Sequence, residues 1–227
     1  MQEKPFSKIN KSFFERESHQ VARELLGKNL VRFFANGKCK VGRIVEVEVY
    51  QGFDDKASHA FGTKTNRNSI MYGKGGYYYI YLIYGMYHCL NIVTEKEGLP
   101  AAVLIRAIEP VIDYSRDLTK LSLKEKRLLG SGPGRLCRWL EIDKSFNGKG
   151  IPDDKLYLIS SVIPSEVEES FKKGSKRSLH SGRDDNQKSD DKIKIATAKR
   201  VGVDYAGKST ENEWRYYIKE NKYVSKK

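Results

Sequence analysis

The segment that decides the fold runs from Tyr77 to Ile108 and reads YYYIYLIYGMYHCLNIVTEKEGLPAAVLIRAI. Its three runs of β-branched and aromatic residues, each of which predicts a strand, lie at 77–82, 87–94 and 101–108. Turn residues separate these runs, with Gly85 in the first gap and Gly98 in the second. Strands that recur about every 8–12 residues with such turns between them predict an antiparallel sheet.

Elements on either side of this segment complete the predicted domain. Two upstream runs predict strands at 29–33 and 39–50, and in the second of these Val45, Val47 and Val49 face one way while Glu46, Glu48 and Tyr50 face the other. Helical spacing of apolar residues predicts one helix near 14–25 and a second that starts at 131–133. Together these elements predict an α+β fold in a single domain, 1–227, with helices packed around an antiparallel sheet.

One stretch, Ser161 to Lys192, differs in composition from the rest. It is mostly Ser, Lys, Asp, Glu, Gly and Arg, and its seven basic and seven acidic residues cancel. Because it has too little apolar surface to offset the entropy of ordering, we predict a mobile loop inserted within the domain.

The charge of the chain suggests a polyanionic partner. The 227 residues include 42 Lys and Arg against 29 Asp and Glu, a formal net charge of +13, all of it outside 161–192. Such a balance is typical of nucleic-acid-binding proteins, although a solvated surface tuned for solubility is the alternative. The sequence has no apolar run of membrane-spanning length, no secretory signal, and three cysteines without disulfide or zinc spacing, so we expect a cytoplasmic protein.

Tyrosines are concentrated in one place. Seven of the fourteen lie within 72–87, and Tyr77, Tyr79 and Tyr81 share one face of the predicted strand. Buried tyrosine hydroxyls need partners, so the run fits base stacking as well as packing under a helix, and both interpretations stay open for Tyr79. Tyr84 lies at the turn, where an aromatic side chain is well placed to insert between base pairs.

Several polar residues lie in apolar or aromatic surroundings. A carboxylate in the middle of a strand, as at Glu48, can orient and deprotonate a water, although the neighbouring Glu46 favours an exposed strand face instead. Asn91 and Arg106 interrupt apolar strands, and Arg106 needs an anionic partner, for which Glu48 is the candidate. His59 lies in a basic loop that suits phosphate contacts, and its alternative role is structural.

The motifs resemble those of a known enzyme family. The segments RIVEVEVY (43–50) through HCLNIV (88–93), AAVLIRAIEP (101–110), SGPGRLCRWLEIDKSFNG (131–148), AKRVGVDYAG (198–207) and WRYYI (214–218) occur in the order seen in 3-methyladenine DNA glycosylases of the alkyladenine type. The resemblance covers about 14–147 and 193–224, and it implies one mixed domain around a curved antiparallel sheet.

The resemblance also implies roles for the base-binding residues. Glu48, in a Glu-x-Tyr motif, matches the family's catalytic residue. The flipped base would be sandwiched between Tyr50 on one side and His59 and Tyr81 on the other. Asn91 would crowd the exocyclic amine of ordinary guanine.

Further matches concern the duplex and the attacking water. Tyr84 would fill the gap that the flipped base leaves, with Met86 and Tyr87 in the same wedge loop. Arg106 would help to hold the water. One departure from the family pattern is Val49, which is often Ala there and which should point away from the pocket.

The implied activity is hydrolysis of the N-glycosidic bond of a damaged purine in double-stranded DNA. Substrates would be of the 3-methyladenine, 7-methylguanine, hypoxanthine and ethenoadenine class, with a water activated by Glu48 and an abasic site as product. We expect no metal, no cofactor, no lyase step, no membrane partner, and a monomer associated with a bacterial nucleoid. The alternatives are a non-catalytic nucleic-acid-binding module that stacks single-stranded RNA and, less compatible with the charge, a sugar or nucleoside hydrolase.

Overall fold

Two long strands, β2 (Cys39–Gln51) and β5 (Ala101–Asp113), pair antiparallel along their whole length and form the centre of the fold. The computed structural model describes residues 7–160 and 193–226. The other strands are β1 (Asn29–Phe33), β3 (Tyr78–Ile83), β4 (Tyr87–Val93), β6 (Leu156–Ile159), β7 (Ile195–Ala198) and β8 (Arg215–Ile218). All pairings are antiparallel, as the sequence predicts.

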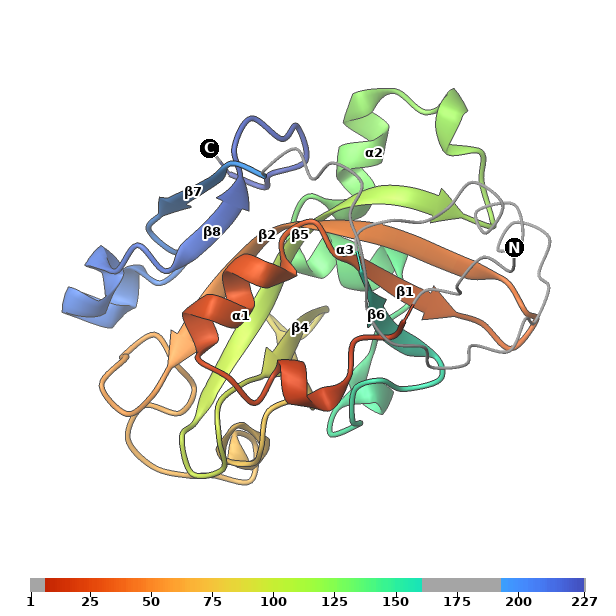
Figure 1. Cartoon of the computed structure of the whole chain (residues 1–227). Helices are drawn as coiled ribbons and strands as arrows, with labels where there is room; N and C mark the ends of the chain where they lie inside the picture. Colours follow the sequence, from red (N-terminus) through yellow and green to blue (C-terminus); the bar gives the residue numbers. More distant parts are fainter. Residues whose placement is uncertain (1–6, 161–192, 227) are drawn as a thin grey trace.

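The sheet is curled and forks at β2 (Figure 1). On one edge of β2 the order continues through β5 and β4 to β3. On the other edge β1 pairs with residues 39–43 and carries β6, while β8 pairs with residues 46–48 and carries β7. The described residues therefore confirm the α+β class and the curved antiparallel sheet.

The fork coincides with an irregularity in the pairing of β2 with β5. Register shifts fall on both sides of Glu46. In a regular strand Ile44 and Val47 would face opposite sides of the sheet, but here both belong to the main hydrophobic core. Val45 packs in a separate cluster with Ala107 and Tyr223. The strict alternation that the sequence predicts for the three valines is therefore wrong at Val45, because a β-bulge changes which side of the sheet the next residue faces.

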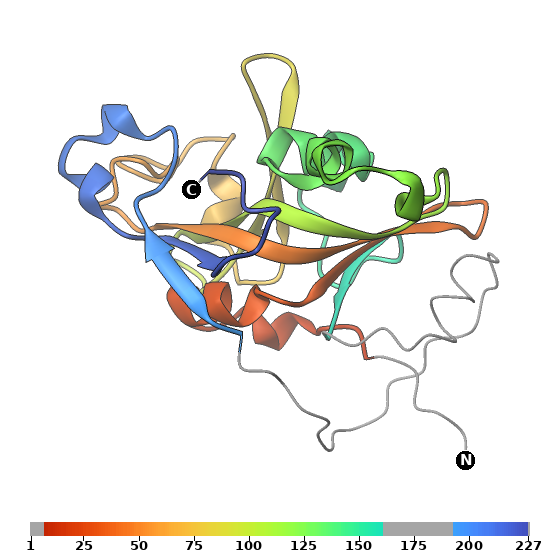
Figure 2. The same ribbon diagram turned by 90° about the horizontal axis from the view of Figure 1, so that it is seen from above.

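Helices cover both sides of the central strands. Figure 2 shows α1 (Ser18–Leu25) on one side of β2 and β5, and α2 (Leu123–Gly130) and α3 (Pro133–Trp139) on the other. The sequence predicts α1 and α3, whereas α2 was not predicted, although its capping box between Ser122 and Glu125 is a readable start signal. Gly130 ends α2 where a Cβ would lie 2.1 Å from the carbonyl oxygen of Ile108, so only glycine fits there.

Short 3-10 helices complete the described chain: η1 (Lys11–Phe13), η2 (Ser69–Tyr72), η3 (Leu118–Lys120), η4 (Lys144–Phe146) and η5 (Asp204–Glu211). The strands that flank the predicted insertion differ from each other. β6 is buried along its length, whereas β7 is partly exposed. The predicted loop at 161–192 lies outside the described residues.

Candidate active site

The register of four adjacent strands brings the predicted site residues onto one face of the sheet. A single cross-strand row runs from Tyr79 to Asn91, then to Leu104, and then to Glu48. The parallel row beside it joins Val93 to Ala102 and Ala102 to Tyr50. Residues that are far apart in the chain thus become neighbours because the backbone hydrogen bonds align them.

A cavity of about 390 Å³ opens over this face. Its walls are formed by residues of the strands β2, β3, β4 and β5, of the loop 57–71, and of the segment 201–205 that follows β7. Six of the predicted site residues line it: Tyr50, His59, Tyr81, Tyr84, Asn91 and Arg106. Glu48 itself is fully buried behind the wall, where two of its contacts, Tyr50 and Arg106, face the cavity.

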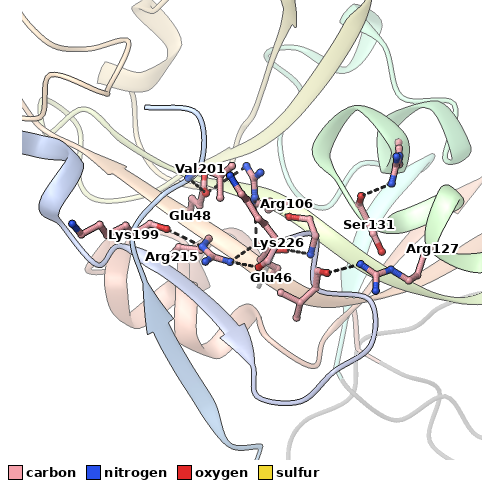
Figure 3. A network of polar contacts seen from close by, with 12 residues as sticks. Glu46, Glu48, Arg106, Arg127, Ser131, Lys199, Val201, Arg215 and Lys226 are labelled. Atoms are coloured by element: carbon pink, nitrogen blue, oxygen red, sulfur yellow. Dashed lines mark hydrogen bonds and ion pairs between the residues drawn. The ribbon is translucent and has the colours of Figure 1, made fainter. Parts of the chain in front are cut away.

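Glu48 is held by three groups, of which Val201 and Arg106 are shown in Figure 3. The Val201 backbone N–H donates to Oε1 at 2.8 Å, the Tyr50 hydroxyl donates to Oε2 at 2.8 Å, and Arg106 Nη1 lies 3.4 Å from Oε1. Burial raises the pKa of Glu48, and the nearby Glu46 adds to the rise, while Arg106 and the two hydrogen bonds oppose it. The carboxylate is therefore an oriented proton acceptor with a higher affinity for protons than an exposed glutamate has.

The prediction that Arg106 pairs with Glu48 is confirmed, and a second partner joins them. Glu46 Oε1 lies 3.3 Å from Arg106 Nε, and the Glu46 side chain is fully buried. The alternative interpretation, in which Glu46 marks an exposed strand face, is therefore wrong. Glu46 lies on the same side of the sheet as Glu48, and Arg106 on the neighbouring strand contacts both carboxylates.

Aromatic rings form the walls of the cavity. The His59 and Tyr81 rings have centroids 4.5 Å apart at an interplanar angle of 64°, and His59 Nδ1 is 2.8 Å from the Tyr79 hydroxyl. Burial, with Arg67 nearby, lowers the pKa of His59, so the imidazole is neutral at pH 7. Tyr79, for which stacking and packing were both open, is 2% exposed and packs with Met71 and its neighbours.

The side-chain amide of Asn91 is fixed beside these rings. Its Nδ2 donates to the carbonyl oxygens of Tyr79 at 3.1 Å and of Cys89 at 3.4 Å. Because both contacts are to strand backbone, the amide cannot swing freely, and its position in the cavity wall is set by the β3–β4 pairing.

The three predicted wedge residues occupy different environments at the β3–β4 hairpin. Tyr84 is 82% exposed and Met86 is 65% exposed, so both project from the tip. Tyr87 is partly buried, and its ring lies against Gly134 and 5.3 Å from the Arg138 guanidinium of α3. Tyr84 and Met86 thus form the protruding part of the hairpin, and Tyr87 anchors its base on α3.

Several residues for which the sequence predicts no individual role complete the site. Arg200 is fully buried, pairs with Asp55, and places its guanidinium 4.8 Å from the Tyr50 ring. Tyr205 is 73% exposed and lines the same cavity as Tyr84. Both lie in the segment 198–207, which is too short to carry a clear periodic signal.

Across residues 7–160 and 193–226, no group of three or more His, Cys, Asp or Glu side chains is arranged to hold a metal ion. In the same ranges no helix is long and apolar enough to cross a membrane. The cavity thiol, Cys89, has its pKa raised to about 11 by burial, which leaves it protonated and poorly nucleophilic.

Comparison with known proteins matches this architecture. The family model described as methylpurine-DNA glycosylase (MPG) aligns with residues 12–222. This chain belongs to the methylpurine-DNA glycosylase family. Similar proteins described as "Putative 3-methyladenine DNA glycosylase" include one from Clostridium novyi (strain NT), 40% identical, with 97% of this chain and 99% of the relative covered. Others are from Alkaliphilus oremlandii (strain OhILAs), 39% identical with 97% and 100% covered, and Clostridium perfringens (strain SM101 / Type A), 40% identical with the same coverage.

Membership defines the class of enzyme. The chain is a DNA glycosylase, its substrate is DNA, and its process is DNA repair. A DNA substrate accounts for the positive charge, and the alternative of a non-catalytic RNA-binding module no longer applies.

Proposed function

We propose that this glycosylase flips alkylated and deaminated purines out of duplex DNA and hydrolyses the N-glycosidic bond, leaving an abasic site. The observation that carries the proposal is a buried carboxylate, Glu48, fixed beside Arg106 under a cavity walled by aromatic rings. The substrate class is that of 3-methyladenine, 7-methylguanine, hypoxanthine and ethenoadenine.

The cavity suits a flat, electron-poor base. Its volume of about 390 Å³ falls in the range of roughly 300–1,000 Å³ that is usual for small-molecule sites. Tyr50 and the pair of His59 and Tyr81 would take opposite faces of the base. A 3- or 7-alkylated purine carries a positive charge, which the π-faces of tyrosines attract, and a neutral His59 does not repel it.

The bond-breaking step needs one water and one base. The bond between C1′ and the purine nitrogen breaks with its electron pair leaving on the purine, so positive charge develops on the sugar. The water oxygen bonds to C1′, and its proton goes to Glu48. Ionised Glu48 also stabilises the developing charge, and Arg106 would hold the water. Glu48 is buried behind Tyr50 and Arg106, which line the cavity, so the water would approach the carboxylate between these two side chains.

A neutral leaving group such as hypoxanthine would depart more readily if it were protonated. The raised pKa of Glu48 does not supply that proton, because Glu48 must be ionised to accept one from water. Damaged purines that are already cationic are therefore the substrates that the site favours most. No lysine is used as an amine nucleophile in this scheme, so we expect a monofunctional enzyme.

The hairpin tip supplies the means of keeping the base outside the helix. Unstacking a base costs a few kcal/mol, and the cost is smallest at damaged pairs. Tyr84 and Met86, the exposed apolar residues of the tip, would fill the space left in the duplex and offset that cost. Tyr87, packed on α3, would give the wedge a rigid base.

The test uses defined duplexes, each carrying one 7-methylguanine, hypoxanthine or 1,N6-ethenoadenine, with an undamaged duplex as control. The proposal expects abasic sites, seen as strand breaks after hot alkali, at the lesion only. Without alkali the strands should stay intact, because a monofunctional enzyme has no lyase step. Tight binding to the damaged duplexes without any abasic site would contradict the proposal.

Two further predictions remain with this proposal. The enzyme acts as a monomer, which size-exclusion chromatography with light scattering can check in the presence and absence of duplex. Location in a bacterial cytoplasm, in association with the nucleoid, also stays a prediction.

A further inference from the structure

A second buried carboxylate, Glu46, lies beside the catalytic pair and takes no part in the proposed chemistry. It is fully buried, it does not line the cavity, and so it touches neither base nor water. Burying a charge is costly unless it is paired, so its contacts show what it holds in place.

Glu46 connects the active-site arginine to the end of the chain (Figure 3). Its Oε1 faces Arg106 Nε at 3.3 Å and accepts a hydrogen bond from Arg215 Nη1 at 3.0 Å. Its Oε2 accepts from the Ser225 backbone N–H at 2.6 Å, and the Ser225 hydroxyl accepts from Arg106 Nε at 3.0 Å. Arg215 in turn donates to the Lys226 carbonyl oxygen at 2.8 Å.

This arrangement divides the donors of Arg106 between two carboxylates. Nε is taken by Glu46 and Ser225, which leaves Nη1 directed at Glu48. A guanidinium is a rigid planar fork, so fixing Nε fixes the direction of Nη1 as well. The two glutamates and the two arginines, Arg106 and Arg215, also balance to zero formal charge in a buried cluster.

We propose that Glu46 is a positioning residue for base excision, which clamps Arg106 from behind and, through Ser225 and Arg215, fastens the C-terminal residues against the active site. The inference rests on the proposed function. It extends the machinery from the motif around Glu48 to residues 215–226, which contribute no atom to the cavity wall.

The variant Glu46→Gln tests this inference. Glutamine keeps the shape but presents one NH₂ group, so in either orientation it opposes a donor, on Arg106 and Arg215 or on Ser225. We expect the single-turnover excision rate of a 1,N6-ethenoadenine duplex to fall about ten- to hundred-fold, with the Kd for the duplex changed less than threefold, because misplaced groups slow chemistry more than binding.

The matched control is Glu109→Gln. Glu109 pairs with Arg43 across the same two strands, β5 and β2, but does not line the cavity, and the pair is partly exposed. Its excision rate should stay within twofold of wild type. The double variant Arg106→Gln, Glu46→Gln should excise less than twofold more slowly than the single variant Arg106→Gln. The reason is that Glu46 acts through Arg106, so its effect disappears when the arginine is absent.

Three outcomes would overturn the inference. These are a Glu46→Gln rate within twofold of wild type, an equal loss from Glu46→Gln with and without Arg106, or a loss that appears only in Kd. If Glu46→Gln does not fold, Glu46→Asp keeps the charge and withdraws it by one methylene, and its rate must still fall at least fivefold. Absence of excision by the wild-type enzyme is a different result, which would count against the proposed function itself.

Discussion

At Glu48, burial and neighbouring charges act in opposite directions on one carboxyl group. Desolvation favours the protonated form, and Arg106 with two hydrogen bonds favours the ionised form. The net effect is a raised pKa, which gives a general base a higher affinity for the proton that it removes from water. The neighbouring residues thus adjust a common side chain to the proposed task.

Replacing this carboxylate should separate catalysis from binding. Glu48→Gln removes the proton acceptor and keeps the size of the side chain, so single-turnover excision should fall by at least about 10²–10⁴-fold. Affinity for the damaged duplex should survive, because the aromatic walls and the basic surface are unchanged. Quench-flow or manual sampling gives the rate, and fluorescence anisotropy gives the Kd. Excision by this variant near the wild-type rate would exclude Glu48 as the base.

The pH dependence of excision should report the same group. With 7-methylguanine, which is cationic and needs no protonation to leave, only the ionised base is required. The rate should therefore fall as the pH is lowered through the pKa of Glu48, with a midpoint above the ordinary glutamate value of 4.5, and stay level at higher pH. Below the midpoint the loss approaches tenfold per pH unit.

His59 is the group that could imitate this acid limb, since its protonation would repel a cationic base. Its pKa is lowered by burial and by Arg67, so its protonation begins at a lower pH than that of an ordinary histidine. His59→Asn is the control: the acid limb should persist in this variant if Glu48 causes it. An acid limb that disappears with the imidazole would reassign the titration to His59.

The β3–β4 hairpin is an element built around a strained tip. Met86 N–H donates to the Ile83 carbonyl oxygen at 3.2 Å, and the two residues between them, Tyr84 and Gly85, have φ of 52° and 69°. Positive φ at both central positions suits a two-residue hairpin turn, but for a tyrosine it costs roughly 1–2 kcal/mol. Glycine or asparagine would fit more easily, so the exposed ring at Tyr84 is retained at the expense of stability.

Removing that ring should matter most when the duplex is intact. Tyr84→Ala should slow excision from a fully paired lesion more than from the same lesion in a one-nucleotide bulge, where unstacking is already partly done. Single-turnover rates on the two duplexes measure the difference. An equal fall in the excision rate on the paired and the bulged duplex would mean that Tyr84 acts in the pocket. Met86 and Tyr87 would then be the candidates for the wedge.

Controls on the same hairpin distinguish a wedge from an electrostatic contact. Tyr84→Phe keeps the ring and should retain the rate on paired DNA. Tyr84→Ala carries no change in charge, so the dependence of log K on log salt, about 0.9 per neutralised phosphate, should match that of wild type. A shallower slope in the alanine variant would contradict the wedge assignment.

At the scale of the whole molecule, the forked sheet determines what the segment 161–192 has to connect. β6 and β7 lie on separate branches, which leave β2 near residue 41 and residue 47. Six strand residues correspond to roughly 20 Å. Ile193, just before β7, lies against Gly27, which follows α1. The C-terminal end of the connection is therefore on the side of the sheet that α1 covers (Figure 2).

We predict that residues 161–192 are dispensable. Their charge is balanced, and closing a loop costs only about 0.6 kcal/mol per doubling of its length, so shortening the connection has little thermodynamic effect. A Gly/Ser linker of about twelve residues reaches roughly 40 Å when extended, enough for the gap between the branches. Excision rate and melting temperature should stay near wild type. Insolubility or a large fall in melting temperature would show that the segment is required for the folded state.

Local patterns in the sequence predicted five of the strands and two of the α-helices. Alternation and turn residues predicted β1 to β4 closely and β5 only as far as Ile108, five residues short of its end at Asp113. Helical spacing predicted α1 and α3, because these patterns depend on neighbours within a few residues. The ion pair of Arg106 with Glu48 was also predicted, since an arginine in an apolar strand needs an anion. The assigned roles of Tyr50, His59, Tyr81 and Asn91 came from family resemblance and stay predictions.

Only the tertiary structure decided what lies around these elements. Pairing of β8 with β2 brings Val201 to Glu48 and Arg215 to Glu46, across separations of about 150 to 170 residues that no local pattern records. The bulge beside Glu46 reversed the expected side of Val45, because Val45 is an extra residue in the pairing of β2 with β5 and interrupts the alternation. Periodicity and composition can be read from short segments of sequence. Strand register and ion pairing arise only in the assembled sheet, and they bring the residues of the candidate active site together.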